Sequence, residues 1–183
     1  MLELKIPEIP ELWDEKNECF DSVKAQTLQL EHSLVSISKW EAKWHLPFLT
    51  EVRYQRLTND QLIDYIKCMT ITKNVPDIVY RAMLPQQVQE IIDYINDPAT
   101  ATTFVEDNSP PNFEVLTSEV IYWEMINFGI WKECEKWNIN RLVTLIRVCN
   151  EKNKKGQRMS EKEIYAQNAA VNAARRRMLH TRG

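Results

Sequence analysis

The 183-residue chain is 44% hydrophobic and 27% charged, which suffices for the core of one ordinary soluble domain. Its longest nearly apolar stretch, "RLVTLIRVC", is far shorter than the roughly 20 residues that span a membrane. Three glycines exclude a glycine-rich phosphate loop, and four scattered cysteines without a Cys-x-x-Cys pair indicate reduced thiols rather than a zinc site.

The net charge of −3 conceals a strong asymmetry along the chain. Residues 1–130 carry 10 Lys+Arg against 21 Asp+Glu, a net charge of −11, whereas residues 131–183 carry 13 against 5, a net charge of +8. A basic end of this kind indicates an acidic partner, which is nucleic acid, another protein or the acidic part of the same chain.

Residues 1–27 read as extended. The stretch "LELKI" alternates in hydrophobicity, Pro7 and Pro10 oppose a helix, and "ELWDEKNECFDSV" predicts two short strands around an acidic turn. We therefore expect a short N-terminal β hairpin that lies against a helical body. The segment has neither the basic start nor the apolar run of a signal peptide, so we expect a cytoplasmic protein.

Helical periodicity begins near residue 32, and Pro47 is expected to end the first helix. An apolar stripe on this helix results from the helical spacing of Leu34, Ile37, Trp40, Glu41 and Trp44, in which Glu41 is the polar member. Thr58 and Gln61 form a capping box for the second helix. Its predicted buried face comprises Leu62, Ile63, Ile66 and Met69.

Two further helical segments, "DIVYRAML" and "PQQVQEIIDYIND", follow, with Pro85 in the first turn of the second. The stripe of that helix comprises Val88, Ile91, Ile92 and Ile95. Residues 97–113 are proline-rich and polar and predict a loop. After the loop, "TSEVIYWEMINFG" predicts a helix that is capped by Thr117 and ends before Gly129.

The segment "NINRLVTLIRVCNEK" predicts the central helix of the domain. From Arg141 onward its polar residues, Arg141, Thr144, Arg147 and Glu151, form one narrow line, and the other residues between Arg141 and Cys149 are apolar. A helix with so narrow a polar stripe is usually buried on most sides.

The last part of the chain predicts a projecting basic arm. "KNKKGQRM" reads as a linker, and Ser160 with Glu163 opens a helix whose large apolar residues Ile164, Val171 and Met178 stand seven apart. The expected fold is thus mainly α. It comprises a short N-terminal β hairpin at residues 1–27, a single compact multi-helix domain at residues 28–150, and a basic linker with a C-terminal helical arm at residues 151–183.

Catalysis and metal binding are not supported by any motif. His32 and Ser33 are neighbours, so on a helix their side chains diverge by about 100°, and no nucleophile elbow surrounds them. The acid pairs Asp60/Asp64 and Asp93/Asp97 lack a third ligand and read as solvated helix faces. We expect no catalytic, cofactor-binding or metal site and hence a non-enzymatic protein.

Partner binding remains as the expected activity. Trp40, Trp44, Trp123 and Trp137 fall on apolar stripes and are expected in the core, whereas Trp13 and Trp131 fit no stripe and are candidate exposed anchors. In the arm, the candidate contact residues are Ile164, Val171, Arg175, Arg176, Arg177 and Met178. The arginines could instead complement the helix dipole or bind phosphates. Nucleic acid is the less favoured partner, because no aromatic residues alternate with these charges.

Five stretches carry a resemblance to a known family: "TLQLEHSLVSISKWEAKWHLPFL", "DYIKCMTIT", "YINDPATATTF", "ECEKWNINRLVTLIRVCN" and "NAAVNAARRRMLHTRG". Together they resemble the tail assembly chaperones of tailed bacteriophages, over most of the chain after residue 27. The resemblance implies a protein that binds the tape-measure protein and keeps it soluble until the tail tube polymerises. It implies no cofactor, the host cell cytoplasm, and absence from the mature virion.

Two further expectations concern partners. Self-association is one, and contact with a membrane is not expected. The alternative function is that of a phage DNA-associated or head–tail structural protein that uses the basic C-terminal tail. Duplex binding that weakens steeply with salt would distinguish this alternative from the chaperone.

Overall fold

The structure is a computed structural model that describes residues 1–14, 18–104, 115–156, 165 and 169. Its contacts divide the chain into two units, Met1–Ile146 and Arg147–Gly183. The division falls inside helix α7 (Ile139–Gly156), close to the expected end of the helical domain at residue 150. The following description concerns the first unit.

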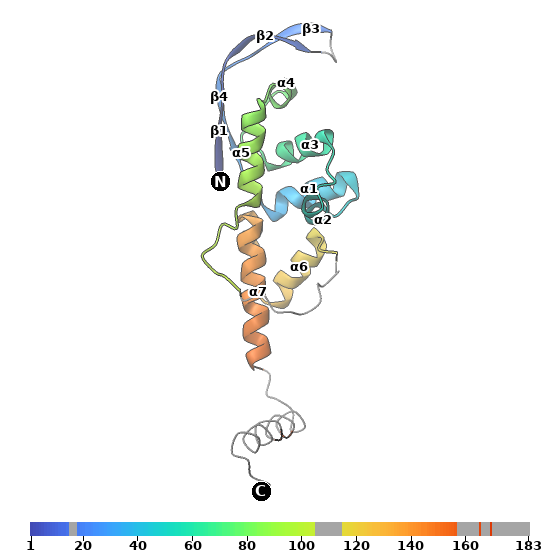
Figure 1. Cartoon of the computed structure of the whole chain (residues 1–183), viewed down its shortest axis with the longest axis vertical. Helices are drawn as coiled ribbons and strands as arrows, with labels where there is room; N and C mark the ends of the chain where they lie inside the picture. The colour runs from blue at the N-terminus through green and yellow to red at the C-terminus, as the bar shows by residue number, and fades with distance from the viewer. Residues whose placement is uncertain (15–17, 105–114, 157–164, 166–168, 170–183) are drawn as a thin grey trace, which may run out of the picture. The chain divides into compact units, whose positions relative to one another are not determined.

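Four short strands form two antiparallel pairs (Figure 1). They are β1 (Leu2–Ile6), β2 (Ile9–Asp14), β3 (Cys19–Val23) and β4 (Gln26–Leu30). Strand β2 pairs with β3, which confirms the predicted hairpin. Strand β1 pairs with β4, with Leu4 opposite Leu28, and this pair was not predicted. The expected boundary at residue 27 therefore lies within a strand, whose inward residues Leu28 and Leu30 are buried.

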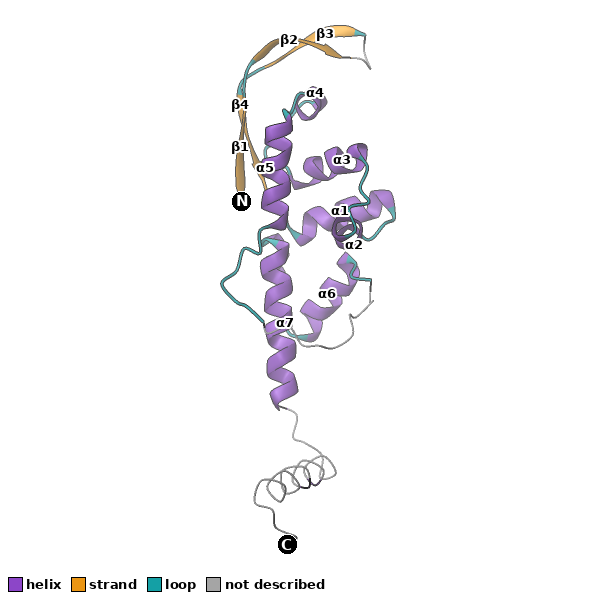
Figure 2. Ribbon diagram, in the orientation of Figure 1, coloured by secondary structure: helices purple, strands orange, loops and turns teal. Residues whose placement is uncertain are grey.

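The rest of the described chain is mainly helical, as predicted (Figure 2). The helices before α7 are α1 (Leu34–Trp44), α2 (Phe48–Arg53), α3 (Asn59–Met69), α4 (Asp77–Arg81), α5 (Pro85–Asn96), α6 (Ser118–Asn127) and the short 3-10 helix η1 (Lys132–Lys136). None of the helices in the described ranges is long and apolar enough to cross a bilayer.

Helix starts follow the predicted capping chemistry in most cases. Thr58 and Gln61 form the predicted capping box of α3. The Ser33 hydroxyl accepts the Ser36 amide at the start of α1, a cap that was not predicted. Pro85 occupies the first position of α5. Thr117 precedes α6 as predicted, but its side chain accepts no capping hydrogen bond. Another residue satisfies the first amide of α6, as described below.

The core is centred on Trp40, which is fully buried. Its ring packs edge-on against Phe48 at 5.0 Å between centroids, and its indole N–H donates to the Gln61 carbonyl at 2.9 Å. Phe48 in turn stacks on Tyr65. On α3, Ile66 and Met69 are buried as predicted, whereas Leu62 and Ile63 are only half-buried because Tyr65 occupies the core instead.

The prediction that α7 is the central helix is wrong for the part that belongs to the first unit. One face of this part is buried, and it presents Ile139, Leu142 and Ile146 at helical spacing. Val143 and Leu145 beside that face are only partly buried. The exposed Arg141 places its guanidinium 4.5 Å from the centroid of the Trp137 ring.

Replacing Leu142 with alanine is expected to lower the free energy of unfolding by about 3 kcal/mol, because it removes a fully buried side chain and leaves a cavity. Urea denaturation followed by tryptophan fluorescence measures the change. Leu145→Ala, at a half-exposed position of the same helix, is the control and should cost less. Equal losses for the two variants would contradict the assigned face.

Candidate protein-binding site

The tryptophans separate into buried and exposed groups. Trp40 is buried and Trp44 half-buried, as predicted. Trp13 is 50% and Trp131 78% exposed, which confirms the exposure predicted for these two candidate anchors. The prediction of a core position is wrong for Trp123, which is 60% exposed, and also for Trp137, which lies at the surface. Exposed side chains of this size are the usual anchors of protein interfaces.

Trp123, Ile126 and Trp131 form what we call the α6–η1 surface. Trp123 and Ile126 are three residues apart and therefore lie on the same outer face of α6. Ile126 is 80% exposed, whereas Ile121 and Met125 on the opposite face are buried. The helix α6 thus carries apolar side chains on both faces, and only one face is covered by the described residues.

A Schellman motif places Trp131 at the C-terminal end of the same helix. The Ile130 amide donates to the Met125 carbonyl at 2.8 Å, and the Gly129 amide donates to Ile126 at 3.1 Å. Gly129 has a φ of +63°, a left-handed conformation that glycine adopts without strain. Trp131 follows two residues later, so its Cα lies within about 7.6 Å of the Gly129 Cα.

The helix η1 begins directly after Trp131, is linked to α6 by a hydrogen bond and contacts α1. The Tyr122 hydroxyl of α6 donates to the Glu135 carboxylate of η1 at 3.0 Å. Burial, and then this hydrogen bond, raise the pKa of Tyr122 to about 12. Cys134 of η1 is buried in the core. The α6–η1 surface therefore lies on elements that are anchored to the fold.

A buried carboxylate fixes the start of α6. One Glu41 oxygen accepts the Phe48 amide at 2.9 Å, and the other accepts the Ser118 amide at 2.8 Å. These amides belong to the first residues of α2 and α6, where unsatisfied N–H groups and the helix dipole favour a negative charge. Sequence analysis placed Glu41 on a helical stripe but did not predict this role.

A second exposed aromatic surface lies on the hairpin, and we call Trp13 and Phe20 the hairpin surface. The two residues face each other across β2 and β3, with ring centroids 5.1 Å apart and edge-on packing. Trp13 also lines an open groove of about 780 Å³ together with Trp44 and charged residues of α1, α3 and α4. Trp13 and Trp131 thus belong to different elements.

The acid pairs behave differently from each other. The prediction of a solvated Asp64 is wrong, because Lys43 and the Trp44 indole both donate to its carboxylate. Asp93 accepts a hydrogen bond from Gln89 within α5. Over the described residues, no group of three or more His, Cys, Asp or Glu side chains is arranged to hold a metal ion.

His32 and Ser33 have separate structural roles. The His32 ring is buried against Tyr65 and Phe48, and its Nδ1 lies 2.5 Å from the Tyr65 hydroxyl. Burial lowers the pKa of His32 to about 3, so that the imidazole is neutral at physiological pH. Ser33 caps α1. The two side chains do not form a nucleophile–base pair.

The candidate contact residues of the arm lie outside the described residues. They are Ile164, Val171, Arg175, Arg176, Arg177 and Met178. Their role in partner binding stays a prediction.

No family model, curated protein or solved structure matches this chain.

Proposed function

We propose that the protein is a non-catalytic binding protein that holds an apolar segment of a partner chain on the α6–η1 surface. One observation carries the proposal: Trp123, Ile126 and Trp131 are each at least 60% exposed and lie on one anchored helix and the turn that follows it. Exposed tryptophan side chains on anchored elements are the usual anchors of protein interfaces.

We further propose that the partner is the tape-measure protein of a tailed bacteriophage. Support comes from the resemblance of five sequence stretches to tail assembly chaperones. In this role, the protein keeps the long partner chain soluble in the host cytoplasm until the tail tube polymerises, and it is then released. Large, rigid aromatic side chains suit this task, because they bury much apolar area at a small cost in side-chain entropy.

The double variant Trp123→Ser/Trp131→Ser tests the binding role. Co-expression with the tape-measure protein, followed by pull-down, should recover roughly tenfold less partner than the parent protein does, as expected for the loss of interface anchors. The melting temperature should change little, because both side chains are exposed. Tyr54→Ser, at another exposed aromatic residue, is the control. Undiminished capture by the double variant would refute the α6–η1 surface as the site.

A further inference from the structure

A continuous groove runs along α5. Three adjoining hollows form it, with volumes of about 480, 180 and 450 Å³. Val52 and Ile95 line both the first and the second hollow, and Leu62 and Ile92 line both the second and the third. We call the three hollows together the α5 groove. The 12 residues of α5 are about 18 Å long, and the first hollow continues past the end of α5 toward α7, so the groove is at least about this long.

The apolar lining of the α5 groove is accessible to a partner. Val52, Leu57, Leu62 and Ile92 are only partly buried, although the last two fall on stripes that sequence analysis predicted to be buried. The apolar faces of α3 and α5 therefore turn toward a shared space that neither helix fills. The polar residues of the lining include five neutral amides: Gln55, Asn59, Gln89, Asn96 and Asn140.

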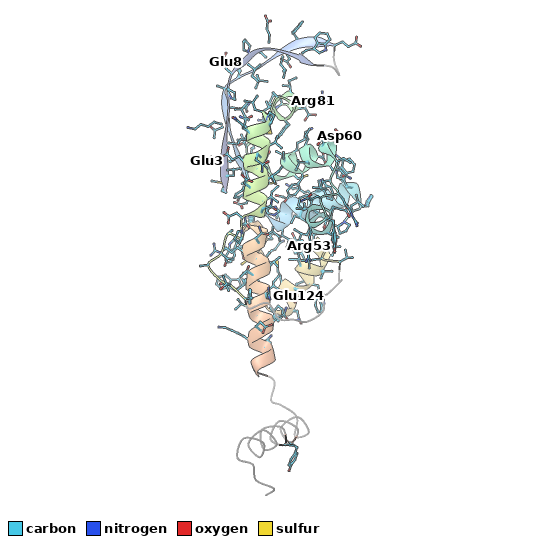
Figure 3. All side chains as sticks on the ribbon, viewed as in Figure 1. Glu3, Glu8, Arg53, Asp60, Arg81 and Glu124 are labelled. Carbon is cyan, nitrogen blue, oxygen red and sulfur yellow. The ribbon has the colours of Figure 1, made fainter. Side chains whose placement is uncertain are left out.

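The charged residues that line the α5 groove are both arginines. Arg53 of α2 lines the first hollow and Arg81 of α4 lines the third, and no carboxylate lines any of the three. Figure 3 labels the two arginines. Both arginines are exposed, and Arg53 forms no ion pair with any other described residue. This is notable because residues 1–130 carry a net charge of −11. The groove thus has an arginine at each end, with apolar and neutral polar residues between them.

We propose that the α5 groove binds an amphipathic helix of another protein, with an apolar face of about three turns and a carboxylate beside each end. An apolar groove between helices accepts a helix whose anchors recur at three- and four-residue spacing. Arginine binds carboxylates through two parallel N–H donors, so Arg53 and Arg81 would fix the position of the helix along the groove. This site is separate from the α6–η1 surface.

Two fluorescein-labelled peptides test the proposal with the full-length protein. Each has about 18 residues and a leucine stripe of helical period, and they differ only in carrying glutamates or lysines at both ends. Fluorescence anisotropy should show saturable binding of the glutamate-ended peptide and at least about tenfold weaker binding of the lysine-ended peptide.

Arg53→Glu should weaken the binding of the glutamate-ended peptide about tenfold and strengthen the binding of the lysine-ended peptide. Arg56→Glu is the matched control, because Arg56 is an exposed arginine nearby that does not line the groove. Ile92→Glu, whose fold is checked by circular dichroism, should abolish binding of both peptides. The Trp123→Ser/Trp131→Ser variant should bind the peptides normally, which separates this site from the proposed capture of the tape-measure protein.

Three results would overturn the proposal. The first is the absence of saturable binding by the glutamate-ended peptide. The second is equal binding of the two peptides, or binding that Arg53→Glu leaves unchanged. The third is a dimer of the parent protein in sedimentation that Ile92→Glu converts to a monomer, because the groove would then be occupied by a second copy of this chain.

Discussion

Replacing Glu41 with alanine is expected to lower the free energy of unfolding by about 4 kcal/mol, the range found when one member of a buried charged interaction is removed. The Glu41 carboxylate accepts the first amides of α2 and α6, and all three residues are buried. Without it, two buried N–H groups lose their acceptor and cannot recover a hydrogen bond from water. Urea denaturation followed by far-UV circular dichroism measures the loss.

Two matched variants separate the charge from the shape of Glu41. Glu41→Gln preserves the volume and one acceptor oxygen, but its amide group would point donors at the second backbone N–H, so an intermediate loss is expected. Glu51→Ala removes a half-buried acid of α2 that makes one long ion pair, and it should cost less than about 1 kcal/mol. A loss below 1 kcal/mol for Glu41→Ala would mean that Thr117 or the preceding chain caps α6 instead.

Periodicity and capping signals predicted most helices of the described chain. Thr58, Gln61 and Pro85 each satisfy backbone groups within a few residues, so their effects can be read from local sequence. The hairpin β2–β3 was predicted for the same reason, since its strands are close in the chain. The pair β1–β4 was missed, because a pairing over more than 20 residues has no local turn signal and "QTLQL" alone is short.

The candidate site was only partly predictable. Trp131 was expected to be exposed because it fits no stripe, and it is. Trp123 was assigned to the core because α6 has apolar residues all round, so its periodicity did not identify the covered face. Glu41 lies 77 residues from Ser118, and no spacing rule predicts such a contact. The α5 groove was also missed, because stripes predict which faces are apolar but not whether two facing helices close the space between them.

Acidification from pH 7 to pH 5 is expected to remove about 2 kcal/mol of stability through His32 alone. The His32 pKa is about 3 in the buried site, against 6.5 for an unburied imidazole. Between these two values, the unfolded chain binds a proton that the folded chain does not, so stability falls as the pH falls. Above about pH 7 both states are neutral and His32 contributes no pH dependence.

His32→Gln should therefore reduce the loss of stability between pH 7 and pH 5 by about 2 kcal/mol, whatever its effect on stability at pH 7. His45→Gln is the control for a histidine replacement, because His45 is exposed at the end of α1. Urea denaturation at several pH values measures the stability of both variants and of the parent protein. The His32 carbonyl also accepts the Ile139 amide at 2.7 Å, so a charged ring would disturb the junction of α1 with the start of α7. Identical pH dependence for His32→Gln and the parent protein would mean that the folded chain accommodates the protonated ring.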